Sequence, residues 1–283
     1  MSDLRWYVKK AARRAVATGA TLPGLGVRAT SPDRPAIRAL TYHRFGPQER
    51  DAFSVTPAAF EEQMAWLASE GLATSLQAVL DLAQGRATPR DGSVLVTIDD
   101  GCPSVRTHAL PILRRHRIPA VVFVPAGEIL EHPEPPPIHE TDGSRMSWPE
   151  LGELVEAGIT IGSHAFTHHS LGRMPAESAR EQLARSRALI AERTGQAASA
   201  FAYPFGTRAD YTPATAALVA ETGYDCAFTS QHGCIQAGAD VMELPRIKVE
   251  GGEGLEMFRR IVHGGMDGWR FIDRTLWRLQ AAR

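Results

Sequence analysis

The sequence has few cysteines and no long hydrophobic run. Its 283 residues include three cysteines, Cys102, Cys226 and Cys234, which are odd in number and widely spaced. This pattern fits neither a disulfide framework nor a zinc ribbon, and it predicts three reduced thiols. No apolar stretch approaches the length of a membrane span, and the N-terminus lacks the apolar core of a secretory signal. We therefore expect a cytoplasmic protein without a transmembrane segment.

Neither sign of charge is in excess. The chain has 31 Lys and Arg against 32 Asp and Glu, for a formal net charge of -1. Nucleic-acid binders carry a broad basic footprint, so we expect no nucleic-acid partner. Four basic residues between positions 9 and 14 follow the apolar residues of positions 4–8. This segment predicts either a basic helix that contacts a membrane surface or an ordinary solvated helix.

Short β-rich runs alternate with helical patterns along most of the chain, which implies parallel strands with helices outside. The predicted strands are 37–42, 94–98, 120–124, 159–161, 200–203, 226–229 and 242–246. The predicted helices are 57–70, 76–83, 105–116, 148–157, 177–194, 213–222 and 254–262. About seven such units favour a closed barrel over an open sheet.

Chemically active side chains follow four of the predicted strands. They are His43 after 37–42; Asp99 and Asp100 after 94–98; His164, His168 and His169 after 159–161; and Pro204, Phe205 and Gly206 after 200–203. The carboxyl ends of barrel strands meet at one face, where active sites form. We therefore expect these side chains to lie together.

One acid and two imidazoles of this set suit a catalytic metal. One carboxylate and two histidines leave an open coordination position on a divalent cation, and a spacing of four lets His164 and His168 reach one ion. Adjacent buried acids repel unless they share a cation or a proton. We interpret one acid of the Asp99–Asp100 pair as a metal ligand and the other as a base that takes a proton from water. Taken singly, Asp-Asp-Gly is also a common turn, and an H-x-x-x-H spacing also arises by chance in a chain with ten histidines.

Three motifs together carry a family resemblance. "VTIDDG", "SHAFTHHSL" and "FAYPFG", in this order, resemble the first motifs of the polysaccharide deacetylases of the NodB-homology type, carbohydrate esterase family 4. The segments "LTYHRFG" and "LPRIKVEG" support it. The resemblance covers about residues 36–265, which we interpret as the catalytic domain. Residues 1–35 are then an N-terminal basic helical extension, and residues 266–283 a C-terminal helical tail.

The resemblance implies an α/β fold, a distorted (β/α) barrel of about seven strands. It also implies hydrolysis of the acetamide of N-acetylated sugars with a divalent metal, usually Zn²⁺; the same ligands also accept Co²⁺, Ni²⁺ or Fe²⁺.

The family roles carry over by position. Asp99 matches the general base, and the metal ligands are Asp100, His164 and His168, with His169 a weaker candidate. The oxyanion and substrate turn matches Tyr203, Pro204 and Phe205, and the backbone N–H of Phe205 is the donor.

The sequence departs from the commonest family pattern at the general acid. The late Leu-x-His motif is missing, and Ala202 stands where many relatives have arginine. A subgroup that resembles biofilm and exopolysaccharide deacetylases has a histidine in an early "YH" strand end, so we predict His43 as the acid. The alternative is a buried structural histidine. Arg246 is expected either to orient Asp99 in place of the missing arginine or to serve in packing.

Two other functions stay open at this stage. One is a deformylase or deacetylase of a lipid-linked amino sugar, which the basic N-terminal segment would suit. The other is a non-catalytic carbohydrate-binding barrel that has lost the acid chemistry.

Overall fold

A computed structural model describes residues 3–21, 35–47, 51–134 and 143–275. Within these residues the main sheet has seven parallel strands in the order β8-β7-β6-β5-β4-β1-β9. The strands are β1 (Ile37–Tyr42), β4 (Ser93–Ile98), β5 (Ala120–Val124), β6 (Thr160–Ser163), β7 (Ala200–Ala202), β8 (Cys226–Phe228) and β9 (Arg246–Lys248). The predicted (β/α) architecture is confirmed.

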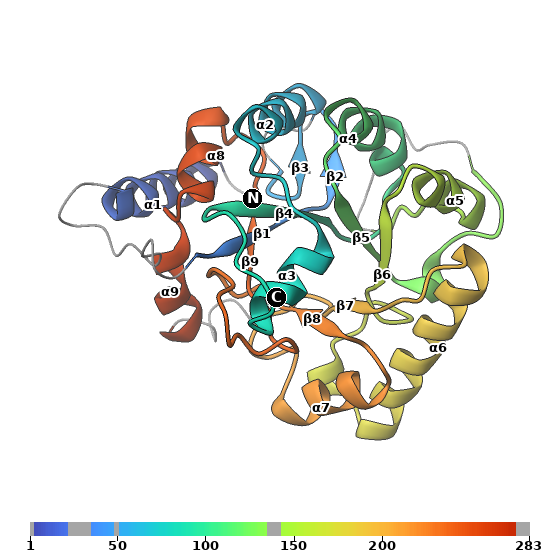
Figure 1. The fold of residues 1–283 in the computed structure, drawn as a ribbon. Helices are drawn as coiled ribbons and strands as arrows, with labels where there is room; N and C mark the ends of the chain where they lie inside the picture. The colour runs from blue at the N-terminus through green and yellow to red at the C-terminus, as the bar shows by residue number, and fades with distance from the viewer. Residues whose placement is uncertain (1–2, 22–34, 48–50, 135–142, 276–283) are drawn as a thin grey trace.

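Most helices surround the strands on the outside, whereas α3 lies over the centre of the barrel (Figure 1). The α-helices of the described residues are α1 (Asp3–Thr21), α2 (Pro57–Glu70), α3 (Leu76–Ala83), α4 (Leu110–His116), α5 (Trp148–Glu156), α6 (Ala176–Thr194), α7 (Pro213–Glu221), α8 (Leu255–Val262) and α9 (Arg270–Thr275). Shorter elements are β2 (Arg44–Phe45), β3 (Ser54–Val55), a π-turn at Val105–Ala109 and 3₁₀ turns at Ala126–Glu128, Leu171–Arg173 and Asp267–Trp269.

The barrel is nearly closed. Its edge strands β8 and β9 form no ladder with each other. The Arg246 backbone N–H donates to the carbonyl of Gln231 at 3.0 Å, and Arg246 Nε donates to the carbonyl of Thr229 at 3.0 Å. Backbone and side chain of one residue thus join the two edges where strand pairing stops.

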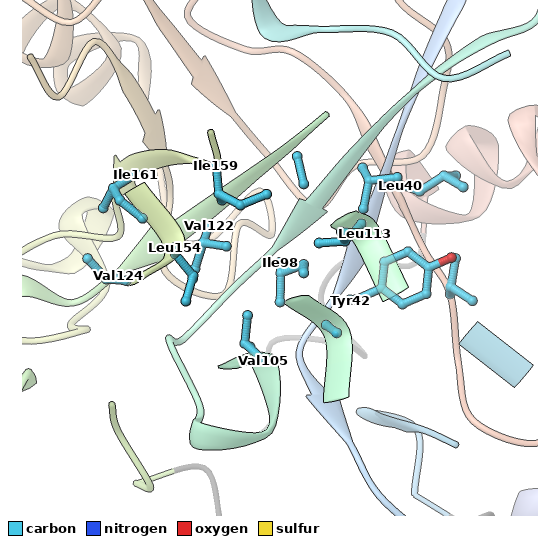
Figure 2. Packing of buried hydrophobic residues seen from close by; sticks show 14 of the residues in the cluster. Leu40, Tyr42, Ile98, Val105, Leu113, Val122, Val124, Leu154, Ile159 and Ile161 are labelled. Carbon is cyan, nitrogen blue, oxygen red and sulfur yellow. The ribbon is translucent and has the colours of Figure 1, made fainter. Parts of the chain in front are cut away.

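Side chains alternate between two apolar layers because successive strand residues point to opposite faces. The outer layer packs the strands against the helices and includes Leu40, Tyr42, Ile98 and Val122 (Figure 2). The inner layer fills the barrel, and α3 contributes to it through apolar side chains. Its members include Ile37, Ala39, Leu95, Val121, Phe123, Val79 and Leu82.

Local signals explain why most predicted helix bounds agree with the structure. Thr56 caps α2 by accepting from the Ala59 N–H, and Pro57 starts the helix without needing a partner for its nitrogen. Ser147 and Glu150 form a capping box at α5. The predictions for 57–70 and 76–83 are confirmed to the residue.

Two predicted elements differ from the structure. The helix at 105–116 begins as a π-turn, with Leu110 N–H donating to the Val105 carbonyl, because Pro111 lacks the N–H of a regular helix. The last predicted strand, 242–246, is wrong in its bounds: Leu244 makes only a single bridge to Phe228, and β9 (Arg246–Lys248) pairs with β1. The small sheet of β2 and β3 was not predicted.

The basic N-terminal helix buries two of its charged side chains, Lys10 and Arg13, whereas Arg14 is exposed. Arg13 Nε lies 2.6 Å from Glu253 Oε1, and Lys10 Nζ lies 3.0 Å from Glu250 Oε2; all four side chains are buried. Tyr7 and Val8, 57% and 60% exposed, face outward instead. The parts of the predicted terminal extensions at 22–34 and 276–283 lie outside the described residues.

Two expectations from composition are also addressed by the structure. None of the three cysteines, all of which lie in the described residues, forms a disulfide bond. A search of the described helices found none that combines the length and apolarity of a membrane span.

Candidate active site

The inner face of the barrel changes from apolar to polar toward the carboxyl ends of its strands. On β4 the inward positions read Leu95, Thr97 and then Asp99, which follows the strand. On β1 the same alternation runs from Ala39 through Thr41 to His43. The strand period therefore delivers polar groups to one end of a barrel that is otherwise filled with apolar side chains.

Asp99 is held by a bidentate ion pair with Arg246. Nη1 and Nη2 of the guanidinium lie 2.7 and 2.8 Å from Oδ1 and Oδ2 of the carboxylate. Both residues are buried. Burial, the largest single influence, would raise the pKa of Asp99, but the charge and hydrogen bonds of Arg246 together with the nearby His164 and His43 outweigh it, and the net pKa lies below the ordinary value. Asp99 is therefore an ionised carboxylate with a fixed orientation.

Asp100 turns away from its neighbour toward two histidines. Asp100 has φ +73°, so its side chain departs in a direction that a regular strand would not give. Asp100 Oδ1 lies 3.3 Å from His168 Nε2 and 3.7 Å from His164 Nε2. Among the described residues this buried oxygen has no hydrogen-bond partner. Burial raises the pKa of Asp100, but the nearby imidazoles of His168, His43 and His164 outweigh burial and hold the pKa well below its usual range.

The donor atoms of Asp100, His164 and His168 all lie within 4.8 Å of one another. His164 Nδ1–H donates to the carbonyl of Ala202 at 2.7 Å, which leaves Nε2 as the lone-pair nitrogen toward Asp100. Burial lowers the pKa of His164 to about 4, so the ring is neutral at neutral pH, as a ligand must be. A buried carboxylate oxygen without a partner beside two imidazole nitrogens suits a divalent cation such as Zn²⁺.

Unusual backbone conformations gather at this edge. Five described residues other than glycine have positive φ, and four of them are Asp100, Ala165, His168 and Phe205. Such conformations cost free energy and persist where the surrounding structure imposes them, commonly at functional sites. The fifth, Arg117, ends α4 and lies elsewhere.

The "YPFG" turn lies against the histidine pair. The Phe205 ring is 58% exposed, and its centroid lies 5.0 Å from that of His168. Gly206 has φ +62°, and a Cβ atom there would come within 2.6 Å of the Ser230 backbone nitrogen, so only glycine fits. Pro204 accepts the Gly206 N–H at 2.7 Å, which tightens the turn.

His43 lies close to the two acids of the site and packs against the ring of Phe53. Its ring contacts Phe53 edge to face at 4.9 Å, and Lys248 Nζ lies 4.0 Å from the centre of the same Phe53 ring. His43 Nδ1 is buried without a partner among the described residues. Burial is the largest influence on the pKa of His43 and lowers it, and the acids Asp100 and Asp99 offset part of that effect.

Two of the predicted site residues lie apart from the cluster. His169 is exposed, and its Nδ1 pairs with Thr167 Oγ1 at 2.8 Å. Tyr203 is buried with its hydroxyl donating to the Met242 carbonyl, and its ring stacks on Tyr211. Only the backbone of Tyr203 therefore adjoins the turn.

Residues beyond those predicted from the sequence also line or support the site. Lys248 stands two positions after Arg246 on the same strand, so strand alternation alone would have found it. Phe53 lies in the loop between β2 and β3 and carries no such signal. The hydrogen bonds from Gln182 of α6 to the loop that carries His164 and His168 also have no local signal in the sequence.

Comparison with known proteins agrees with this geometry. The family described as "Polysaccharide deacetylase" matches residues 86–227. The Bacillus subtilis protein YxkH is 26% identical over 223 residues, which are 78% of this chain and 74% of that protein. The poly-beta-1,6-N-acetyl-D-glucosamine N-deacetylase of Staphylococcus epidermidis is 25% identical over 241 residues, 77% of this chain and 80% of that protein.

A solved structure, that of IcaB from Ammonifex degensii, superposes with a TM-score of 0.68 and 27% identity and covers 82% of this chain and 97% of that one. Family match, relatives and barrel agree with the resemblance carried by the three motifs. The chain belongs to the polysaccharide deacetylase family.

Proposed function

We propose that this protein is a metal-dependent N-deacetylase of N-acetylated saccharides. One observation carries the proposal: the unpartnered buried oxygen of Asp100 faces two imidazole nitrogens, while the adjacent Asp99 is held separately by Arg246. The two neighbouring acids thus have different environments, which suits one for a cation and the other for a proton.

Asp100, His164 and His168 would hold the divalent cation. When bound, such an ion polarises the acetamide carbonyl and lowers the pKa of a water molecule. The Phe205 N–H would donate to the developing oxyanion, a contribution of about 3–4 kcal/mol per donor in well-studied enzymes.

Asp99 would accept the proton of the attacking water. The guanidinium of Arg246 keeps Asp99 ionised and fixes both carboxylate oxygens, so the base is in its proton-accepting form before substrate binds. Arg246 therefore acts as the orienting residue of Asp99.

His43 would donate a proton to the leaving amine. Burial lowers the pKa of His43 below its ordinary value, so the ring releases a proton readily once it carries one, and it must gain that proton before the amine leaves. The Phe53 ring holds the imidazole in place.

The substrate proposal follows the relatives. Because the Staphylococcus epidermidis relative is named for poly-beta-1,6-N-acetyl-D-glucosamine, we propose N-acetylglucosamine oligomers as the first substrates to test. Acetate release is expected from the protein loaded with Zn²⁺, to be lost after a chelator and restored by Zn²⁺. Absence of acetate release at any metal loading would favour the non-catalytic carbohydrate-binding barrel.

The lipid-linked alternative depends on a membrane contact through the N-terminal helix. Lys10 and Arg13, two of the basic residues expected at that surface, are buried on Glu250 and Glu253. We therefore favour a saccharide that is not lipid-linked. A comparison of formylated and acetylated lipid-linked sugars, with vesicle co-sedimentation, tests the choice. We also propose the division of the chain into an N-terminal extension (1–35), a catalytic domain (36–265) and a C-terminal tail (266–283).

A further inference from the structure

The loop that carries both histidine ligands is held in place by α6. This loop joins β6 to the Leu171–Arg173 turn, and Ala165 and His168 within it have φ of +64° and +51°. Neither residue is glycine, so both conformations are unfavourable for the isolated chain. Something outside the loop must therefore impose the arrangement that points His164 and His168 at Asp100.

One side-chain oxygen of α6 collects three donors of this loop. Gln182 Oε1 accepts from the backbone N–H of Phe166 at 3.2 Å, from the backbone N–H of Thr167 at 2.9 Å and from Thr167 Oγ1 at 3.0 Å. Because all three partners donate, the amide orientation is fixed by the contacts themselves. Thr167 directly precedes His168.

The carbonyls of the same loop are held by a second residue of α6 and by the Ala126–Glu128 turn. The Ala165 carbonyl accepts from Ser186 Oγ at 3.0 Å and from the Ala126 N–H at 3.1 Å, and the Phe166 carbonyl accepts from the Gly127 N–H at 2.8 Å. Gly127 cannot carry a Cβ, since it would lie 2.5 Å from the Phe166 ring. The loop carbonyls are therefore held by Ser186 and the Ala126–Glu128 turn, and its N–H groups are held by Gln182.

We propose that Gln182 is a positioning residue for the metal site, acting through the backbone of Phe166 and Thr167 on His168. This inference rests on the proposed metal site and adds a residue that touches neither metal nor substrate. The role requires only an acceptor oxygen at position 182, because all three loop groups donate to it. Glutamate can therefore replace glutamine, whereas an apolar side chain of similar size cannot. Loss of such outer-shell support typically costs about 10- to 100-fold in metal affinity.

The test compares Gln182→Met, Gln182→Glu and a matched control, Gln196→Met. Gln196 also contacts β6, but at its beginning, where it accepts from the Ile161 N–H and donates to the Ile159 carbonyl. Zinc chloride is titrated into each full-length, chelator-stripped protein by calorimetry, and thermal unfolding checks the fold. We expect Gln182→Met to bind Zn²⁺ about 10- to 100-fold more weakly. Gln182→Glu and Gln196→Met should stay within about threefold of the parent, since both keep the acceptor at position 182.

Three results would overturn the inference: parent-like affinity in folded Gln182→Met, affinity in Gln182→Glu as weak as in Gln182→Met, or an equal loss in Gln196→Met. If Gln182→Met does not fold, Gln182→Ala, which also removes the acceptor oxygen, takes its place in the same comparison. A parent protein that binds no Zn²⁺ contradicts both this inference and the proposed function. A parent that binds Zn²⁺ but releases no acetate contradicts only the latter.

Discussion

Among the buried charged groups of the described residues, two clusters are built on opposite principles. At the carboxyl ends of the strands, Asp100 keeps an oxygen without a hydrogen-bond partner beside two histidines. Against α1, Glu250 and Glu253 are surrounded by Lys9, Lys10 and Arg13. We call these the strand-end cluster and the α1 cluster.

The two clusters differ in whether protein groups pair every buried charge, and this difference indicates a structural role for the α1 cluster and a functional role for the strand-end cluster. Burying a charge is costly unless it is paired, and the α1 cluster meets this condition with protein groups alone. The strand-end cluster meets it for Asp99, through Arg246, but not for Asp100. A buried carboxylate oxygen without a hydrogen-bond partner beside two imidazole nitrogens is best explained by a cation that the site is built to receive.

The largest expected effect is that of Asp99→Asn. The substitution removes the proton acceptor but leaves Asp100, His164 and His168 intact, so acetate release should fall about 10²- to 10⁴-fold with zinc content unchanged. Turnover is measured by acetate release and zinc by elemental analysis. A near-normal rate in this variant would remove Asp99 from the role of base.

The next effect belongs to the α1 cluster. Glu253→Gln leaves the buried Arg13 without its 2.6 Å carboxylate partner and should lower the free energy of unfolding by about 3–5 kcal/mol. Turnover of the folded fraction and zinc affinity should not change, because the cluster lies outside the site. Denaturant unfolding and zinc titration measure the two properties, and a selective loss of zinc affinity would break the distinction between the clusters.

A smaller effect is expected from His43→Ala. Loss of the proton donor should reduce acetate release about 10²-fold, the lower end of the range for acid–base groups. Zinc affinity should stay the same, since His43 is not one of the three ligands. An unaltered rate would assign the acid to another group and leave His43 as a packing residue against Phe53.

The smallest effect concerns the stability of the protein at acid pH and tests the ion pairing of the α1 cluster. Burial raises the pKa of Glu250, but the cations Arg13, Lys248 and Lys10 outweigh it and hold the pKa below the ordinary 4.5. A lowered carboxyl pKa stabilises the folded state above the unfolded value, and this contribution is lost as the pH falls below about 4.5. Glu250→Gln should therefore flatten the acid dependence of unfolding there; an unchanged pH profile would show that Glu250 contributes little.

Most of the fold was predictable because its signals are local. Strands such as β1 and β5 and helices such as α2 are defined by apolar periodicity and by caps that lie a few residues apart, and their predicted bounds agree with the structure. The register of β9 was not predictable, since the apolar residues Met242 and Leu244 precede the strand while Arg246 and Lys248 form it. Pairing with β1, far away in sequence, decides it.

The candidate site was predictable in its residues but not in its supports. Motifs after each strand identified Asp99, Asp100, His164 and His168, because the carboxyl ends of parallel strands share one face. The direction of Lys10 and Arg13 depends on Glu250 and Glu253, some 240 positions away, so helical periodicity could not reveal it. The same holds for Gln182, whose partners come from another element.

Crystals soaked in Zn²⁺ and measured at the zinc absorption edge test the central claim most directly. The account predicts one strong anomalous peak within bonding distance of Asp100 Oδ1, His164 Nε2 and His168 Nε2, with Asp99 still paired to Arg246. A peak bound by Asp99 in place of Asp100, or no peak among these three side chains, would contradict it.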